Sequence, residues 1–134
     1  MTFISWKDDY SVRVPEIDTQ HRRLLEVINR LHGAMLMGGK PDALQVVMDE
    51  LVAYTRYHFG YEEQLMERAG YQGVEEHKRK HRAMVTQVEG FAAEITSGKA
   101  SVSLKLMNFL KDWLTRHIME TDQQYSGCLS GRAA

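Results

Sequence analysis

The sequence predicts an all-α protein, an antiparallel up-and-down four-helix bundle with an N-terminal irregular arm. Three observations predict this fold. Apolar residues recur every three or four positions along four long stretches of the chain. Short segments containing glycine separate the stretches, and only two prolines occur in 134 residues. Amphipathic helices joined by short loops pack as antiparallel neighbours, so residues 1–134 are predicted to form a single domain.

The N-terminal arm is predicted to comprise residues 1–17. Its alternation of apolar and polar residues is too short to predict a sheet. Pro15 also favours an extended conformation for the residue before it. We expect the arm to lie across the outside of the bundle, with Trp6 and Tyr10 as its anchors.

The first two helices are predicted at about 18–37 and 41–69. Asp18 or Thr19 can cap the start of the first helix. The glycine pair that follows this helix ends it. Pro41 occupies a favoured first position of the second helix.

The third and fourth helices are predicted at about 74–97 and 102–123. Each carries apolar residues and histidines in the same helical rhythm. Ser101 or Ser103 is a plausible cap for the fourth helix. The short tail after residue 125 receives no assignment.

Composition excludes several classes of protein. Seventeen basic and 18 acidic residues nearly balance, and no basic stripe indicates nucleic-acid binding. No apolar run approaches the length of a membrane span, and the N-terminus lacks the pattern of a secretory signal. We therefore expect a cytoplasmic protein. No large exposed apolar patch is legible in the sequence, and we expect a monomer. Cys128 is the single cysteine, so any metal would be held by histidines and carboxylates.

Most histidines fall on the predicted inward faces of the helices. These residues are His21, His58, His77, His81 and His117. Chance would place five of the six there with a probability on the order of 1%. Glu62 follows His58 by one helical turn and faces the same way. His32 lies off its stripe, and we expect it to bind no metal.

The inward histidines and Glu62 are predicted to share one level of the bundle. Antiparallel neighbours meet at residues equally distant from the loop joining them, and His21 and His58 lie about 18 and 19 residues from Gly39. The same comparison about the other two loops places the candidate residues of neighbouring helices at the same level to within a few ångströms. An unpaired buried carboxylate costs several kcal/mol, whereas a bound cation would stabilise this layer. The pattern therefore predicts a buried metal site.

Asp122 departs from the regular spacing of this layer, because it follows His117 by five residues. On an ideal α-helix the two side chains would point about 140° apart. Either the helix is distorted there, by a π-bulge or an unwound turn, or Asp122 is a surface acid. Spacing leaves both alternatives open.

Five imidazoles and up to two carboxylates exceed the needs of one ion and suit two bridged ions, of iron, zinc, copper or nickel.

The order of these residues resembles that of the hemerythrin family, in particular its single-domain bacterial members. The shared order is His21, His58-x-x-x-Glu62, His77-x-x-x-His81 and His117-x-x-x-x-Asp122. The segment from Val14 to His21 resembles the start of the family's first helix, and the resemblance extends from about Trp6 to Asp122. Arg13 departs from the family, whose members often carry glycine there.

The resemblance implies two iron ions per chain, bridged by an oxo or hydroxo group and two carboxylates. The implied ligands are His77, His81 and His117 for one iron, His21 and His58 for the other, and Glu62 and Asp122 for both. It also implies reversible O2 binding at the second iron, for oxygen storage, transport or delivery to an oxygen-consuming enzyme. A histidine-rich site favours carriage over catalysis, because carboxylate-rich sites better stabilise highly oxidised iron.

Leu25 and Leu114 are predicted to form the wall of the O2 pocket, with Trp113 and Met119 next to them. The alternative is that these four residues only pack the core. An O2, redox or iron sensing module, a di-iron peroxidase or ferroxidase, and a metal store are the competing functions.

Overall fold

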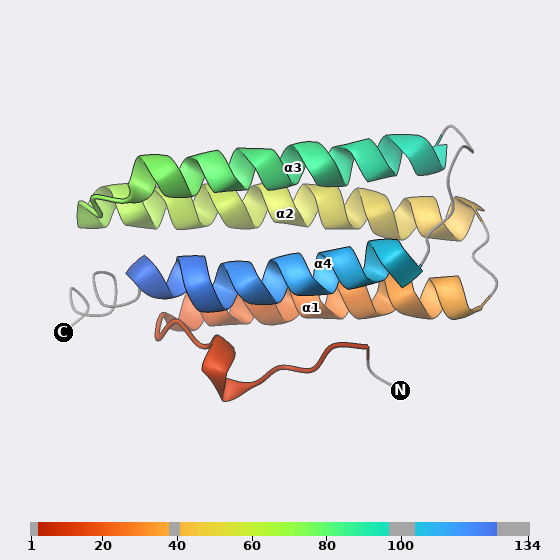
Figure 1. Cartoon of the computed structure of the whole chain (residues 1–134), viewed down its shortest axis with the longest axis horizontal. Coiled ribbons are helices and arrows are strands. Elements are labelled where there is room, and N and C mark those ends of the chain that lie inside the picture. The colour runs from red at the N-terminus through yellow and green to blue at the C-terminus, as the bar shows by residue number, and fades with distance from the viewer. Residues whose placement is uncertain (1–2, 38–40, 97–103, 126–134) are drawn as a thin grey trace.

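The computed structural model describes residues 3–37, 41–96 and 104–125, which form a bundle of four long helices (Figure 1). The elements in order are the short 3₁₀ helix η1 (Asp8–Tyr10), α1 (Pro15–Leu36), α2 (Pro41–Ala69), α3 (Val74–Thr96), α4 (Leu104–Arg116) and the π-helical η2 (His117–Asp122). The described ranges contain no strand, which confirms the predicted fold class. The predicted helix ends at 97 and 102, and Cys128, lie outside these ranges.

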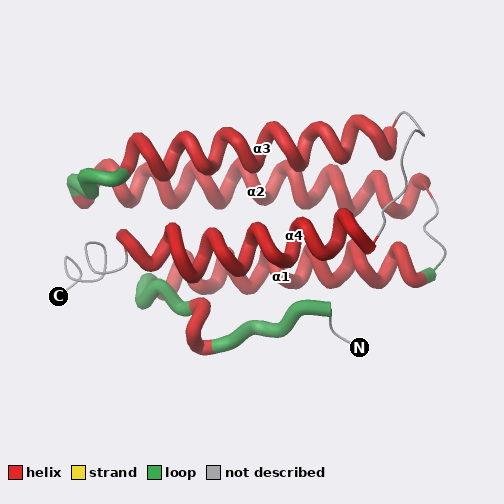
Figure 2. The backbone as a smooth tube through the Cα atoms, in the orientation of Figure 1, coloured by secondary structure: helices red, strands yellow, loops and turns green. Residues whose placement is uncertain are grey.

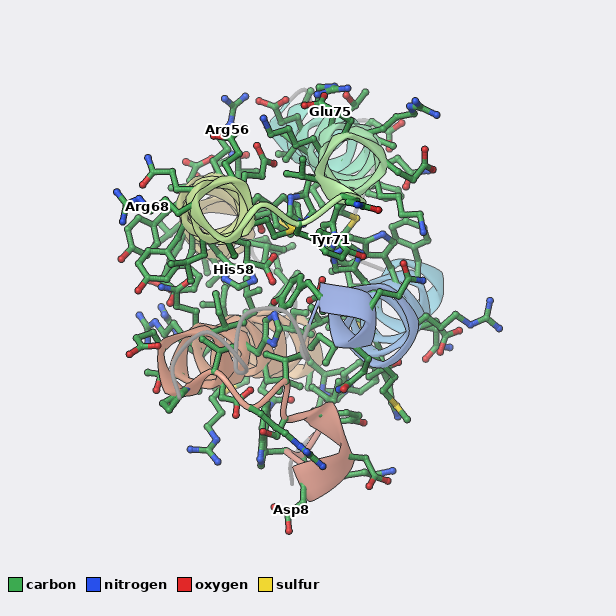
Figure 3. All side chains as sticks on the ribbon, turned by 90° about the vertical axis from the view of Figure 1, so that its left-hand side faces the viewer. Asp8, Arg56, His58, Arg68, Tyr71 and Glu75 are labelled. Carbon is green, nitrogen blue, oxygen red and sulfur yellow. The ribbon has the colours of Figure 1, made fainter. Side chains whose placement is uncertain are left out.

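The four helices run antiparallel and occupy the corners of a square in end view (Figure 3). α2 lies beside α1 and α3, and α4 completes the square (Figures 1 and 3). Within the described ranges, no helix has the length and apolar character needed to cross a membrane. Because the four helices surround it, the interior of the square is the place where side chains from all of them can meet.

The N-terminal arm follows the outer face formed by α1 and α4 (Figure 2). Asn29 of α1 holds the arm by two hydrogen bonds, accepting from the Ile4 N–H at 2.9 Å and donating to the Ile4 carbonyl at 2.8 Å. Phe3 stacks on His32 at 4.4 Å between ring centroids. Tyr10, one of the two predicted anchors, is buried. The stack on Phe3 places His32 at the arm.

Helix α1 begins at Pro15 rather than near Asp18. Pro15 takes the first helical position, where its missing N–H costs no hydrogen bond. The Asp18 carboxylate instead accepts hydrogen bonds from the Ser11 hydroxyl at 2.6 Å and the Val12 N–H at 2.8 Å. Asp18 therefore fastens the arm to the helix. Arg13, which lies between Val12 and the start of α1, has a φ of 61°, in the left-handed region that favours glycine.

Helix α2 ends at Ala69 and is followed by Gly70, whose φ is 71°. The Gly70 N–H donates to the Glu67 carbonyl at 3.1 Å, and the Tyr71 N–H donates to the Met66 carbonyl at 3.0 Å. This pair of bonds is a Schellman motif. It fixes the turn into α3 and hence the relative level of the two helices.

In the described part of the chain, the core consists of two apolar clusters separated by a layer of buried polar side chains. The smaller cluster is formed by Val12, Val14, Ile17, Met66 and Tyr125. The larger cluster fills the rest of the bundle. Every helix crosses the polar layer on its way from one cluster to the other; in α1, for example, His21 lies between Ile17 and Leu24. The polar layer is thereby shielded from solvent at both ends.

Candidate metal centre

The seven candidate ligands predicted from the sequence meet in this polar layer. They are His21 from α1, His58 and Glu62 from α2, His77 and His81 from α3, and His117 and Asp122 from η2. None of them exposes more than 5% of its surface. Their ligating atoms form two overlapping groups, each with all atoms within 4.8 Å of one another. Each of the two groups has a composition and spacing that could hold a metal ion.

The helices deliver these side chains through the i, i+4 repeat. His58 and Glu62 are one turn apart on the inner face of α2, and His77 and His81 are related in the same way on α3. Figure 3 shows His58 on the inner side of α2, whereas Arg56 of the same helix points outward. The helical spacing that turns apolar side chains toward the core therefore turns these polar side chains toward it as well.

Asp122 reaches the centre because the last helix changes from α to π at His117. A π-helix bonds residue i to residue i+5, so a five-residue step completes about one turn and returns to the same face. Asp122 is fully buried. Of the two alternatives left open by the sequence, the distorted helix is correct.

The Asp122 carboxylate lies between two groups of histidines. Its Oδ1 is 2.8 Å from Nε2 of His77 and 3.0 Å from Nε2 of His117. Its Oδ2 is 3.1 Å from Nε2 of His21. The two oxygens of one carboxylate therefore face opposite sides of the centre, as a bridging ligand requires.

Glu62 is the second shared carboxylate. Its Oε1 is 3.3 Å from Nε2 of His58 and 3.2 Å from Nε2 of His81. Its Oε2 is 3.6 Å from Nε2 of His21. Glu62 also belongs to both overlapping groups of ligating atoms.

The unsatisfied atoms of the centre show that it fits metal ions. Among the described residues, every buried side-chain nitrogen or oxygen that lacks a hydrogen bond belongs to one of the seven candidate ligands. The Nε2 atoms of all five histidines are among them. These atoms approach the carboxylate oxygens without hydrogen-bond geometry, because both kinds of atom point at shared space. Leaving so many buried polar atoms unpaired would be costly without a ligand, and imidazole and carboxylate are donors for transition metals.

The electrostatics of the metal-free centre are dominated by its two carboxylates. Burial acts to raise the pKa of Glu62, but the surrounding imidazoles, His58 first among them, hold it well below its usual range. Burial and Glu62 act to raise the pKa of Asp122, yet the imidazoles lower it. Burial acts to lower the pKa of His21, but Asp122 and Glu62 outweigh burial and raise it to about 9. For His58, burial prevails and the pKa is lowered.

Three further polar residues contact the candidate ligands, and the sequence did not predict them. Gln20 Oε1 lies 2.7 Å from Nδ1 of His58, and Glu63 Oε2 lies 2.8 Å from Nδ1 of His81. The Tyr125 hydroxyl donates to Oε2 of Glu62. Gln20 and Glu63 adjoin candidate ligands in the sequence, and this proximity was the one available signal.

The rings of a phenylalanine and a tryptophan stack nearly parallel on two of the histidines. Phe59 stacks on His81 with 3.8 Å between centroids and 4° between planes. Trp113 stacks on His117 at 4.8 Å and 11°. These stacks restrict the rotation of both imidazoles and keep water from their faces. A surface groove of about 440 Å³ between α3 and α4 reaches Trp113 and His117 from outside.

A small apolar cavity of about 10 Å³ lies one turn from the histidine layer. Leu114 and Trp113, two of the predicted pocket residues, line it together with Leu24 and Thr55. Leu25 is buried in the same core cluster but is not among the lining residues.

The prediction that Met119 belongs to the pocket wall is wrong. Its side chain is 45% exposed. Met119 follows His117 by two residues in the π-helical segment, close to half of a helical turn, so the two side chains lie on opposite faces. It therefore faces solvent while His117 faces the core.

Comparisons with known proteins agree with this geometry. The model of the family described as Hemerythrin HHE cation binding domain matches residues 12–129. A bacteriohemerythrin of Stenotrophomonas maltophilia is 38% identical over 94% of this chain and 81% of that protein, and myohemerythrin-1 of Phascolopsis gouldii is 27% identical over 92% of each. A crystal structure of wild-type hemerythrin superposes with a TM-score of 0.91 at 28% identity, covering 96% of this chain and 99% of that one.

Proposed function

Because the chain belongs to the hemerythrin family, we propose that it binds O2 reversibly at a pair of iron ions held by the seven clustered side chains. His77, His81 and His117 form a first position, and His21 and His58 form a second position. Glu62 and Asp122 would contribute to both positions. A single observation carries the proposal: the two oxygens of the buried Asp122 face different groups of histidines, Oδ1 toward His77 and His117 and Oδ2 toward His21.

The unequal numbers of histidines give the two positions different capacities. A ferrous pair, when bound, supplies the two electrons that reversible O2 binding requires. Three imidazoles and two shared carboxylates leave the first position little room for an added ligand. The second position would be held by one imidazole fewer, and would therefore leave more room for an added ligand.

The cavity beside the centre supports reversible binding. At about 10 Å³, it is at the lower limit of the volume that holds one water-sized molecule. Leu24 and Leu114 are buried among its walls. Apolar walls keep water and protons from the centre and thereby slow irreversible oxidation.

The lining of this cavity favours a carrier over an enzyme. Among the residues that line it there is no carboxylate, histidine, lysine or arginine that could act as a general acid or base. We also propose that the carrier stores O2 or delivers it to an oxygen-consuming enzyme.

The direct test is to purify the protein under air and to measure its metal content and visible spectrum. We expect about two irons per chain and a ferric absorption that fades when O2 is removed and returns when O2 is restored. Zinc in place of iron, or an absorption that does not respond to O2, would contradict O2 carriage.

A further inference from the structure

Two of the candidate ligands are held by matched partners that differ in charge. The Nδ1–H of His58 donates to the neutral amide of Gln20 at 2.7 Å, and the Nδ1–H of His81 donates to the carboxylate of Glu63 at 2.8 Å. The lengths are nearly equal, and both imidazoles are almost fully buried. The chief chemical difference between the two contacts is thus one negative charge.

This charge changes the donor strength of the opposite ring nitrogen. An imidazole that donates its N–H to a carboxylate gains electron density, and its other nitrogen becomes a stronger metal ligand. A bond to a neutral amide has a weaker effect, because it is not charge-assisted. His81, in the first position, should therefore bind a metal more strongly than His58, in the second.

A third contact acts in the same direction. The Tyr125 hydroxyl donates to Oε2 of Glu62, the oxygen that faces His21. Tyr125 is fully buried, and its ring lies 5.4 Å from that of His77 at 30°, so the hydroxyl is held in place. A donated hydrogen bond occupies a lone pair of Oε2 and weakens its bond to a metal in the second position.

We propose that Gln20, Glu63 and Tyr125 are positioning residues that make the two metal positions unequal. They strengthen the first position, which becomes the anchored one, and weaken donation to the second. The first position should therefore retain its ion more firmly than the second. This inference rests on the proposed function, because it assumes two bound metals.

The test uses the full chain loaded with two Co(II) ions, which report each position by absorption without redox change. The loaded protein is challenged anaerobically with increasing chelator, and the concentration that removes each ion is measured. His58→Ala identifies the step that belongs to the second position. A parent protein that does not retain two ions would contradict the proposed function itself, whatever the variants do.

Three variants test the inference on this background. Glu63→Gln keeps a hydrogen-bond acceptor but removes the charge, and should weaken only the first position, by about tenfold. Gln20→Glu should tighten only the second position by a similar factor. Tyr125→Phe should make the second ion harder to remove. Glu67→Gln and Gln64→Glu are matched controls, since they make the same charge changes on exposed parts of α2 and should alter neither step.

The inference is overturned if Glu63→Gln leaves the first step unchanged or weakens both steps equally. It is also overturned if Gln20→Glu folds and fails to tighten the second step. If Gln20→Glu does not fold, Glu63→Gln alone decides. A second ion lost more easily from Tyr125→Phe would contradict the role assigned to the tyrosine.

Discussion

Leu114→Ala should open the apolar cavity to water while leaving the metal centre intact. Leu114 is 3% exposed and lines the cavity of about 10 Å³. Thr55 is among the residues that line the cavity, and the histidine layer lies one helical turn away. A cavity lined only by apolar groups stays dry. In the enlarged cavity, however, Thr55 and the histidine layer would offer hydrogen-bond partners to water.

The stability cost of this substitution follows from burial. Removing three buried carbons loses about 2.4 kcal/mol of transfer free energy at ~0.8 kcal/mol each, and the cavity left behind adds to this. We expect a loss of roughly 3 kcal/mol, or a Tm lower by roughly 10 °C. Iron content should remain that of the parent, because Leu114 contributes no ligand.

The assay follows the oxidation of the O2-loaded protein by visible absorption, next to a thermal melt. Leu31→Ala is the matched control: Leu31 is fully buried in the same core cluster but is not among the residues lining the cavity. We expect several-fold faster oxidation in Leu114→Ala and the parent rate in Leu31→Ala. Equal rates in both variants would show that Leu114 only packs the core.

Three other predictions concern the ligands, the metal-free state and the arm. His77→Ala should lose most of the iron, as measured by direct metal analysis. The control His32→Ala alters only the stack on Phe3 and should retain the iron. Equal iron content in the two variants would show that His77 is not a ligand. The free energy of unfolding of the metal-free protein should fall by up to roughly 3 kcal/mol as pH rises from 6.5 to about 9. The reason is that the folded state keeps a proton on His21 that the unfolded state has released. Denaturant titrations in which this free energy stays constant or rises with pH would contradict the prediction. Arg13→Gly should raise stability by up to about 1 kcal/mol, seen as a higher Tm, because φ is 61°; a lower Tm would mean that the arginine contributes contacts that outweigh the strain.

Helical periodicity predicted most of the fold, because it depends on local spacing. The bounds of α2 were predicted well, since Pro41 and Gly70 act through their own backbone preferences. The start of α1 was placed too late because two residues competed for it. Pro15 begins the helix, and Asp18, a good capping residue, bonds to the arm instead.

The five histidines and Glu62 could be placed from the sequence because each lies on a regular helical stripe. Asp122 could not be placed by spacing alone, because its position depends on a π-helix that the residue pattern does not specify. Gln20 and Glu63 were missed for a different reason. They contact histidines of neighbouring helices, and such contacts depend on helix rotation rather than on spacing within one helix.

The most direct test of the central claim is anomalous diffraction at the iron absorption edge from crystals of the aerobically purified protein. We predict two iron peaks inside the bundle, each bonded to Glu62 and Asp122, with three histidines on one ion and two on the other. A single peak, an ion outside this layer, or a layer that holds no iron would contradict the account.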